Sequence, residues 1–201
     1  MTCRPVFCLF AATVAVSSAF VAISDSVCRA ADIGSPAPVW NDVPGTDDKL
    51  HSLSDHSDAK VIVVAFLCNK CPCVKGYEAR FNRFAEKYGS QGVRFVAFNS
   101  SLGDLENMAT MKQRASGGKL RFDYLRDASQ QVGRAFGATS TPHIFILDQN
   151  RNVVYTGSFD DNRSEAVVKN HYVIDAVDAL LAGKPVPVAK TRQFGCAIGY
   201  Q

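Results

Sequence analysis

The chain has 201 residues, 47% of them hydrophobic and 20% charged, which is typical of one folded globular domain rather than of a disordered or membrane protein. Its formal net charge is only +3, and the basic residues form no stripe. Nucleic acid is therefore not an expected partner, because nucleic-acid-binding domains concentrate basic charge on one face.

Residues 1–30 differ in kind from the rest of the chain. Arg4 is followed by a long, mostly apolar stretch and then by small and polar residues up to Ala30. This order predicts a secretory signal peptide cleaved after Ala30, with Ala19 as an alternative cleavage point. An uncleaved membrane anchor is the competing interpretation, and only then would the protein associate with a membrane. We expect export to the periplasm or another extracytoplasmic space, and a single domain over 31–201.

The first half of that domain shows strand and helix patterns around a cysteine cluster. Short strands are expected near Val39-Trp40 and over 49–53, and the apolar, β-branched run 61–66 predicts a strand buried on both faces. Apolar residues recur at three- and four-residue steps over 74–88, which predicts an amphipathic helix, and 93–98 predicts the next strand. Strand, helix and strand in this order form a βαβ unit with parallel strands.

The second half continues the alternation of helices and strands. The expected elements are helices over 105–115 and 130–136, an extended piece over 122–125, a hairpin of strands 143–147 and 153–156, and a helix over 165–181 that ends at Gly183. A tail with prolines begins at about residue 184. The pattern predicts an α/β fold with a central sheet and no second domain.

Four cysteines fall within residues 31–201: Cys68, Cys71, Cys73 and Cys196. A structural disulfide framework would spread its cysteines along the chain, whereas three of these four lie within six positions. The clustering therefore favours a reactive role for these cysteines over a role in structural disulfides.

The cluster stands between a buried strand and the N-terminus of a predicted helix. Unpaired N–H groups and the partial positive charge at a helix N-terminus stabilise a thiolate, and Lys70 and Lys75 add positive charge nearby. Cys68 and Cys71 are spaced to close a disulfide across the first turn, which predicts a redox pair. Three soft thiolates would also suit zinc or monovalent copper, so a metal-binding module remains an alternative.

The stretch from Phe66 to Lys75 resembles the active-site segment of the peroxiredoxin-like proteins of the redoxin (AhpC/TSA) family. Ser140-Thr141-Pro142-His143 resembles the cis-proline loop of the thioredoxin superfamily, and residues 157–163 and Phe194-Gly195-Cys196 resemble further blocks of the peroxiredoxin-like branch. The resemblance implies a thioredoxin-like fold, with a central mixed β-sheet flanked by helices. It also implies Cys71 as the principal thiol, with Thr141 and Pro142 forming a cis-proline loop.

One departure from the family pattern bears on activity. True peroxiredoxins share a Pro-x-x-x-Thr-x-x-Cys pattern, but counting back from Cys71 this chain has Val64 in place of the Pro and Cys68 in place of the Thr. We therefore expect first a thiol–disulfide oxidoreductase that cycles Cys68 and Cys71. A thiol peroxidase with Cys71 as the peroxidatic cysteine is the alternative.

Cys73 and Cys196 are the candidate resolving or auxiliary thiols. The expected substrates are protein thiols and disulfides or a peroxide, with a redox partner as electron donor and with no cofactor or metal.

Overall fold

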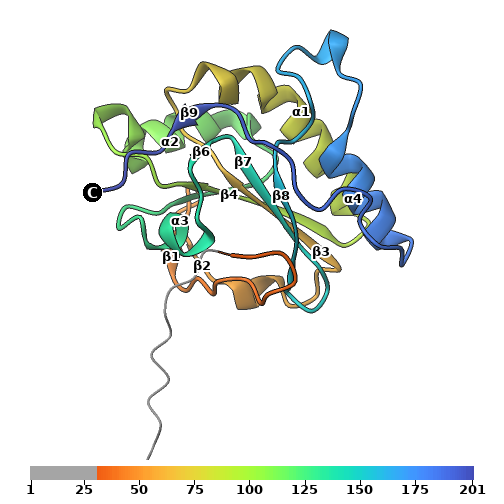
Figure 1. Ribbon diagram of the computed structural model, residues 1–201. Helices are drawn as coiled ribbons and strands as arrows, with labels where there is room; N and C mark the ends of the chain where they lie inside the picture. The colour runs from red at the N-terminus through yellow and green to blue at the C-terminus, as the bar shows by residue number, and fades with distance from the viewer. Residues whose placement is uncertain (1–30) are drawn as a thin grey trace, which may run out of the picture.

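A five-stranded mixed sheet runs through the middle of the computed structural model, which describes residues 31–201 (Figure 1). The proposed signal peptide, residues 1–30, lies outside the described residues. The strand order is β5-β4-β3-β7-β8; β3, β4 and β5 are parallel, and β7 and β8 are antiparallel to their neighbours. The strands are β3 (Val61–Phe66), β4 (Val93–Asn99), β5 (Asp123–Arg126), β7 (His143–Leu147) and β8 (Val153–Gly157).

Helices cover both faces of the sheet. They are α1 (Pro72–Gly89), α2 (Met108–Ala115), α3 (Gln131–Phe136) and α4 (Tyr172–Leu181). Short 3-10 segments are η1 (Leu53–His56), η2 (Asp104–Glu106), η3 (Ser116–Gly118) and η4 (Glu165–Val167). The expected thioredoxin-like α/β architecture is confirmed.

Strand β3 shows why the sheet holds together. Side chains of a strand alternate between its faces, and all six residues of β3 are buried. Val61, Val63 and Ala65 join the core cluster that contains α1 and α4, whereas Ile62, Val64 and Phe66 join the cluster on the opposite face. A strand buried on both faces must be apolar throughout, which is the pattern of this run.

The structure corrects the predicted N-terminal strand. Val39 and Trp40 form no strand; Trp40 is buried edge-on against Phe98, while Val39 is exposed. The hairpin forms instead between β1 (Val43–Pro44) and β2 (Leu50–His51). Core packing of the Trp40 ring, rather than strand pairing, explains the aromatic residue at this position.

The last helix begins later than predicted. Helix α4 starts at Tyr172 rather than at residue 165, and the preceding segment is a single 3-10 turn, η4. The Asp161 carboxylate accepts hydrogen bonds from the backbone N–H groups of Lys169 and Asn170, which holds this segment out of a helix. Gly183 follows the Ala182 C-cap with a positive φ, the conformation in which glycine commonly ends helices.

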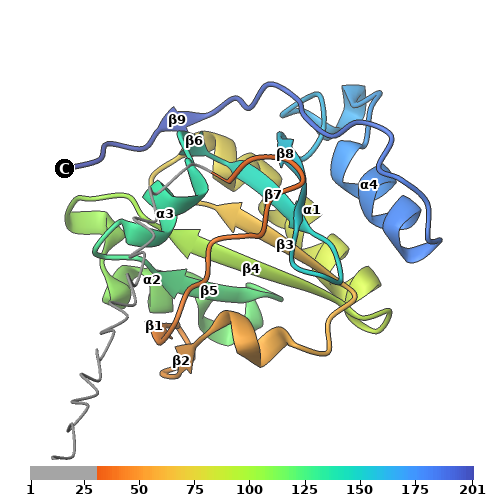
Figure 2. The same ribbon diagram turned by 60° about the horizontal axis from the view of Figure 1, so that its bottom comes forward.

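After α4 the tail returns across the sheet end that carries the cysteines (Figure 2). It runs beside β8: the Thr156 N–H donates to the Ala189 carbonyl and the Thr191 N–H donates to the Thr156 carbonyl, both at 3.0 Å. Gly157 lies against Thr191. It then forms strand β9 (Cys196–Ala197), which pairs antiparallel with β6 (Ser140–Thr141). No helix within residues 31–201 has the length and apolar character needed to cross a membrane.

Candidate active site

The site is built where β3 passes into α1. Cys71 is the N-cap residue of α1 with an extended backbone, and Pro72 occupies the first helical position, where its missing N–H leaves no helical hydrogen bond unmade. Cys68 lies three residues earlier on the connecting loop. Both side chains are buried, with 1% of Cys71 and 6% of Cys68 exposed.

A buried carboxylate holds the loop before Cys71. Glu106, from η2, accepts backbone hydrogen bonds from Asn69 (2.8 Å) and Lys70 (3.0 Å). The side chain of Asn99, at the end of β4, donates to the same carboxylate at 2.8 Å. Loop backbone that would otherwise be unpaired is thus satisfied by a charged acceptor, the stronger class of hydrogen bond.

Arg114 of α2 holds the carbonyl side of the same loop. Its guanidinium donates to the backbone oxygens of Cys68 (3.2 Å) and Asn69 (3.0 Å), and it pairs with Glu78 of α1 at 2.6 Å. The Tyr124 hydroxyl donates to the Asn69 side chain at 3.0 Å. The position of Cys68 is therefore fixed by groups from α1, α2 and β5.

The expected cis-proline loop lies directly against the two sulfurs. The Thr141–Pro142 peptide bond is cis. In its thiol form Cys71 donates from Sγ to the Thr141 carbonyl oxygen at 3.1 Å, and Cys68 Sγ lies 3.1 Å from the Thr141 hydroxyl. Residues about 70 positions apart in the sequence thus meet on one side of the site.

Cys71 is the thiol that this environment ionises. Hydrogen bonding from the Cys68 thiol, and then from the side chain and backbone of Cys196, lowers the pKa of Cys71 well below its ordinary value, although burial opposes the shift. Hydrogen bonding to Cys71 and burial raise the pKa of Cys68. The arrangement gives one thiolate, which can attack a disulfide, and one thiol, which can resolve the mixed disulfide that forms.

The lysines do not supply the positive charge that was expected of them. Lys70 and Lys75 are both exposed, and the pKa of Cys71 is lowered by neighbouring thiol and backbone donors instead. The two lysines are not among the main causes of the lowered pKa of Cys71, because water and salt screen the charge of exposed side chains.

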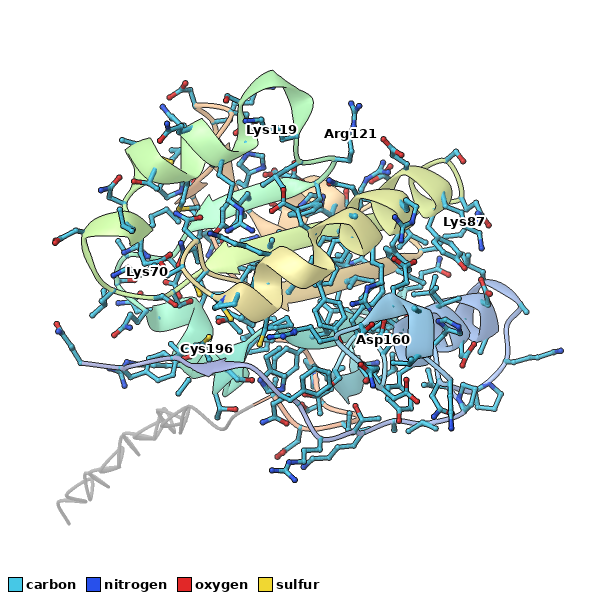
Figure 3. The ribbon with its side chains drawn as sticks, turned by 90° about the horizontal axis from the view of Figure 1, so that it is seen from above. Lys70, Lys87, Lys119, Arg121, Asp160 and Cys196 are labelled. Carbon is cyan, nitrogen blue, oxygen red and sulfur yellow. The ribbon has the colours of Figure 1, made fainter. Side chains whose placement is uncertain are left out.

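Cys196 and Cys73 are the other two cysteines near the site. Cys196 lies on the tail strand beside the start of α1 (Figure 3). Hydrogen bonding to Cys71, followed by burial, raises the pKa of Cys196 to about 12. Cys73 and Cys196 are both partly exposed, and Arg163 Nη1 lies 3.9 Å from Cys73 Sγ. All four cysteines of residues 31–201 are free thiols in this structure.

The geometry does not favour the metal-binding alternative. Within residues 31–201, no group of three or more His, Cys, Asp and Glu side chains is arranged so that it could hold a metal ion.

Comparison with known families decides the affiliation of the chain. Residues 32–172 match the model of the Redoxin family. The chain belongs to the redoxin family. Together with the paired sulfurs at a helix N-terminus, this membership supports a thiol redox function. A search of curated proteins gives no match.

Solved structures similar to this redoxin share its fold. An uncharacterized conserved protein from Geobacillus kaustophilus is 33% identical, with a TM-score of 0.79 over 85% of this chain and 93% of its own. A hypothetical protein from Sinorhizobium meliloti 1021 is 32% identical, with a TM-score of 0.77 over 86% and 97%. A thioredoxin family thiol:disulfide interchange protein from Chlorobium tepidum is 20% identical, with a TM-score of 0.53 over 61% and 83%, which shows the shared fold.

Sequence reasoning missed the groups that position the redoxin's cysteine loop. Glu106, Arg114 and Asn69 meet across 36 to 46 residues of sequence, and no local motif marks them. The only available signal was a charged residue close to each end of a short predicted helix, which is ordinarily a solvated position.

Proposed function

We propose that this redoxin is an exported thiol–disulfide oxidoreductase in which Cys71 attacks and Cys68 resolves. The observation that carries the proposal is the contact of Cys71 Sγ with the Thr141 carbonyl oxygen, beside a cis proline, with Cys68 Sγ 3.1 Å from the hydroxyl of the same threonine. A thiolate so placed has a neighbouring thiol ready for the second half of an exchange.

The exchange balances in two steps. The Cys71 thiolate attacks one sulfur of a substrate disulfide, a mixed disulfide forms, and the other substrate sulfur leaves as a thiolate that takes up a proton. Cys68, having lost its proton, then attacks Cys71 Sγ, so that the Cys68–Cys71 disulfide forms and the second substrate thiol leaves. The substrate gains two electrons and the protein loses two, and an external dithiol restores the reduced pair.

Catalysed reduction of insulin by dithiothreitol tests this function. We expect the full chain to accelerate the reaction and Cys71→Ser to return it to the uncatalysed rate. Cys68→Ser should lower turnover at least tenfold, because the mixed disulfide is no longer resolved internally. Cys8→Ser, which lies outside the described residues, is the matched control and should keep full turnover. A Cys71→Ser protein with wild-type turnover would refute the proposal.

Peroxide reduction is the second candidate, and the burial of Cys71 favours it. Only 1% of this side chain is exposed, so a small oxidant reaches the sulfur more readily than a folded protein does. Peroxide would convert the thiolate to a sulfenic acid, releasing water, and a neighbouring thiol would resolve it. A second-order rate with hydrogen peroxide several orders of magnitude above that of a simple thiolate would support this candidate; a rate like that of a simple thiolate would remove it.

Export is proposed from the sequence of residues 1–30. Fractionation of cells that express the full chain, with sequencing of its N-terminus, tests the proposal. We expect Ala31 as the first residue in the extracytoplasmic fraction. A full-length chain that stays in the membrane fraction would favour the anchor instead.

A further inference from the structure

The tail places Cys196 beside strand β6, whose Thr141 contacts the sulfurs of Cys71 and Cys68. In the β6–β9 pair, Cys196 lies opposite Thr141 and Ala197 opposite Ser140. The Ile198 N–H donates to the Thr139 carbonyl at 3.0 Å, and the Thr141 hydroxyl lies 3.4 Å from the Cys196 carbonyl oxygen. The tail thus takes the place of an added strand on the side of β6 that faces Cys71.

Gly195 allows strand β9 to approach the backbone of Thr141 closely. A Cβ atom on Gly195 would lie 2.1 Å from the Thr141 carbonyl oxygen, a distance that cannot be accommodated without moving backbone. The next glycine of the tail, Gly199, has open space around its Cβ position. The close approach is therefore specific to the residue that precedes Cys196.

Further tail contacts fix the strand from both sides. Beyond it, the Tyr200 hydroxyl donates to the Ala138 carbonyl at 2.7 Å, and the Gln130 side chain donates to the Gly199 carbonyl at 2.8 Å. Before it, the Gln193 side chain donates to the Thr139 hydroxyl at 2.8 Å. These contacts hold Cys196 in place opposite Thr141, the residue whose carbonyl oxygen Cys71 Sγ contacts.

The four cysteines differ in exposure. Cys68 and Cys71 are buried, whereas Cys196 and Cys73 are partly exposed. Cys71 Sγ lies 3.1 Å from the Thr141 carbonyl oxygen, and Cys196 is the residue paired with Thr141 across β6 and β9. A folded protein partner meets Cys196 before it meets either member of the buried pair.

We propose that Cys196 is the exchange residue through which the buried Cys68–Cys71 pair passes a disulfide to a protein partner. The proposal rests on the thiol–disulfide function above and deepens it: Cys71 takes up the disulfide from the substrate, and Cys196 is the sulfur at which that disulfide leaves for a protein dithiol. Strand β9 is the element that carries this sulfur to Cys71.

Each step of the transfer is an ordinary exchange. Deprotonated Cys196 attacks Sγ of Cys71 in the Cys68–Cys71 disulfide; the Cys71–Cys196 bond forms and Cys68 leaves, taking up the proton that Cys196 gave up. One thiolate of a partner dithiol then attacks Cys196 Sγ and releases Cys71 as a thiolate. The second partner thiolate attacks the partner's own sulfur, which frees Cys196 and leaves the partner as a disulfide with two electrons fewer.

Disulfide mapping tests the first step without any turnover. In the full chain with Cys3, Cys8, Cys28, Cys68 and Cys73 all replaced by serine, the two remaining thiols are Cys71 and Cys196. On treatment with oxidised glutathione we expect a monomer with an intramolecular Cys71–Cys196 disulfide. A persistent glutathione adduct on Cys71 with free Cys196, or a disulfide-linked dimer, would overturn the proposal.

Two glycine variants in that background test the role of β9. Gly195→Ala should slow formation of the Cys71–Cys196 disulfide at least tenfold, because the added methyl group pushes β9 away from Thr141. Gly199→Ala should leave the rate within twofold, with thermal unfolding showing that both variants are folded. Equal rates in the two variants would overturn the assignment of β9 as the carrier.

A Cys196→Ser variant, oxidised at Cys68–Cys71, tests the route to the surface. Reduced ribonuclease A, as a protein thiol, should reduce it at least tenfold more slowly than it reduces the oxidised wild type, while dithiothreitol should reduce both within threefold of each other. Equal slowing, or no slowing, with the two reductants would overturn the relay. Failure of the oxidoreductase proposal itself is separately visible, as insulin reduction that survives Cys71→Ser.

Discussion

Cys71 owes its reactivity to the atoms that surround its sulfur. The Cys68 thiol and the Cys196 side chain and backbone direct hydrogen bonds at it, and these favour the thiolate over the thiol. Burial works in the opposite direction, so the ionised form depends on these donors being in place. Removing one donor should therefore change the acidity of Cys71 more than removing a nearby surface charge.

Cys68→Ala removes the largest of these effects. We expect the pKa of Cys71 to rise in this variant, as followed by thiolate absorbance near 240 nm. Lys70→Ala, which removes an exposed charge two residues away, is the control and should leave the titration almost unchanged. A larger change in the pKa of Cys71 in Lys70→Ala than in Cys68→Ala would contradict this description of the site.

The lowered pKa also predicts how stability depends on pH. An unfolded cysteine titrates near pH 8.5, and Cys71 in the folded protein titrates well below this. Its contribution to stability is therefore fully present above the unfolded pKa and is lost as pH falls towards the folded pKa. We expect the difference in Tm between wild type and Cys71→Ser to shrink as pH is lowered from 9 to 4. A difference that grows as pH falls would reverse the assigned sign.

At the scale of elements, the active-site loop depends on η2. Glu106 is almost fully buried, and its carboxylate accepts two loop N–H groups and one from Asn99. A charged acceptor with three donors is hard to replace, since an amide offers one acceptor oxygen and adds donors of its own. The loop that carries Cys68 should loosen when this carboxylate is lost.

Glu106→Gln should lower the free energy of unfolding by about 1–3 kcal/mol, the usual effect of leaving a buried hydrogen-bonding group unsatisfied. Glu165→Gln is the matched control: its ion pair with Arg83 is more than half exposed and is expected to contribute less than about 1 kcal/mol. Urea unfolding measures both. Equal losses in the two variants would show that Glu106 does not support the loop.

Elements with a strong local pattern were predictable, and those fixed by distant contacts were not. The βαβ unit was predictable because the apolar residues that β3 and α1 bury follow the regular spacing of a strand and a helix within each segment. Strand β9 has two residues and exists only through its pairing with β6, so no sequence window reveals it. The start of α4 was misplaced because the Asp161 side chain competes with the helix for backbone donors.

At the scale of the whole molecule, a buried ionic network ties the segment after β8 to α1. Arg80 of α1 pairs with Asp160, whose carboxylate also accepts from the Tyr77 hydroxyl at 2.8 Å. The Arg80 guanidinium also donates to the Asn162 backbone oxygen at 2.9 Å. Figure 3 shows Asp160 between α1 and the C-terminal part of the chain, where the network joins two segments about 80 residues apart.

Asp160→Asn should lower the free energy of unfolding by about 3–5 kcal/mol, because it leaves the buried Arg80 charge uncompensated. Asp58→Asn is the control: the carboxylate of Asp58 is largely exposed, and its ion pair with Arg94 should contribute less than about 1 kcal/mol. Chemical denaturation distinguishes the two. A loss below about 1 kcal/mol for Asp160→Asn would contradict a supporting role for this network.

The central claim is that Cys71 is the sulfur that attacks a disulfide and Cys68 the one that resolves it. Trapping of the mixed disulfide tests both roles at once: Cys68→Ser protein is mixed with a protein disulfide, and the cross-linked species is mapped by mass spectrometry. The account expects one covalent adduct, joined through Cys71, that accumulates in Cys68→Ser and is absent from Cys71→Ser. An adduct through Cys73, or no adduct in either variant, would contradict it.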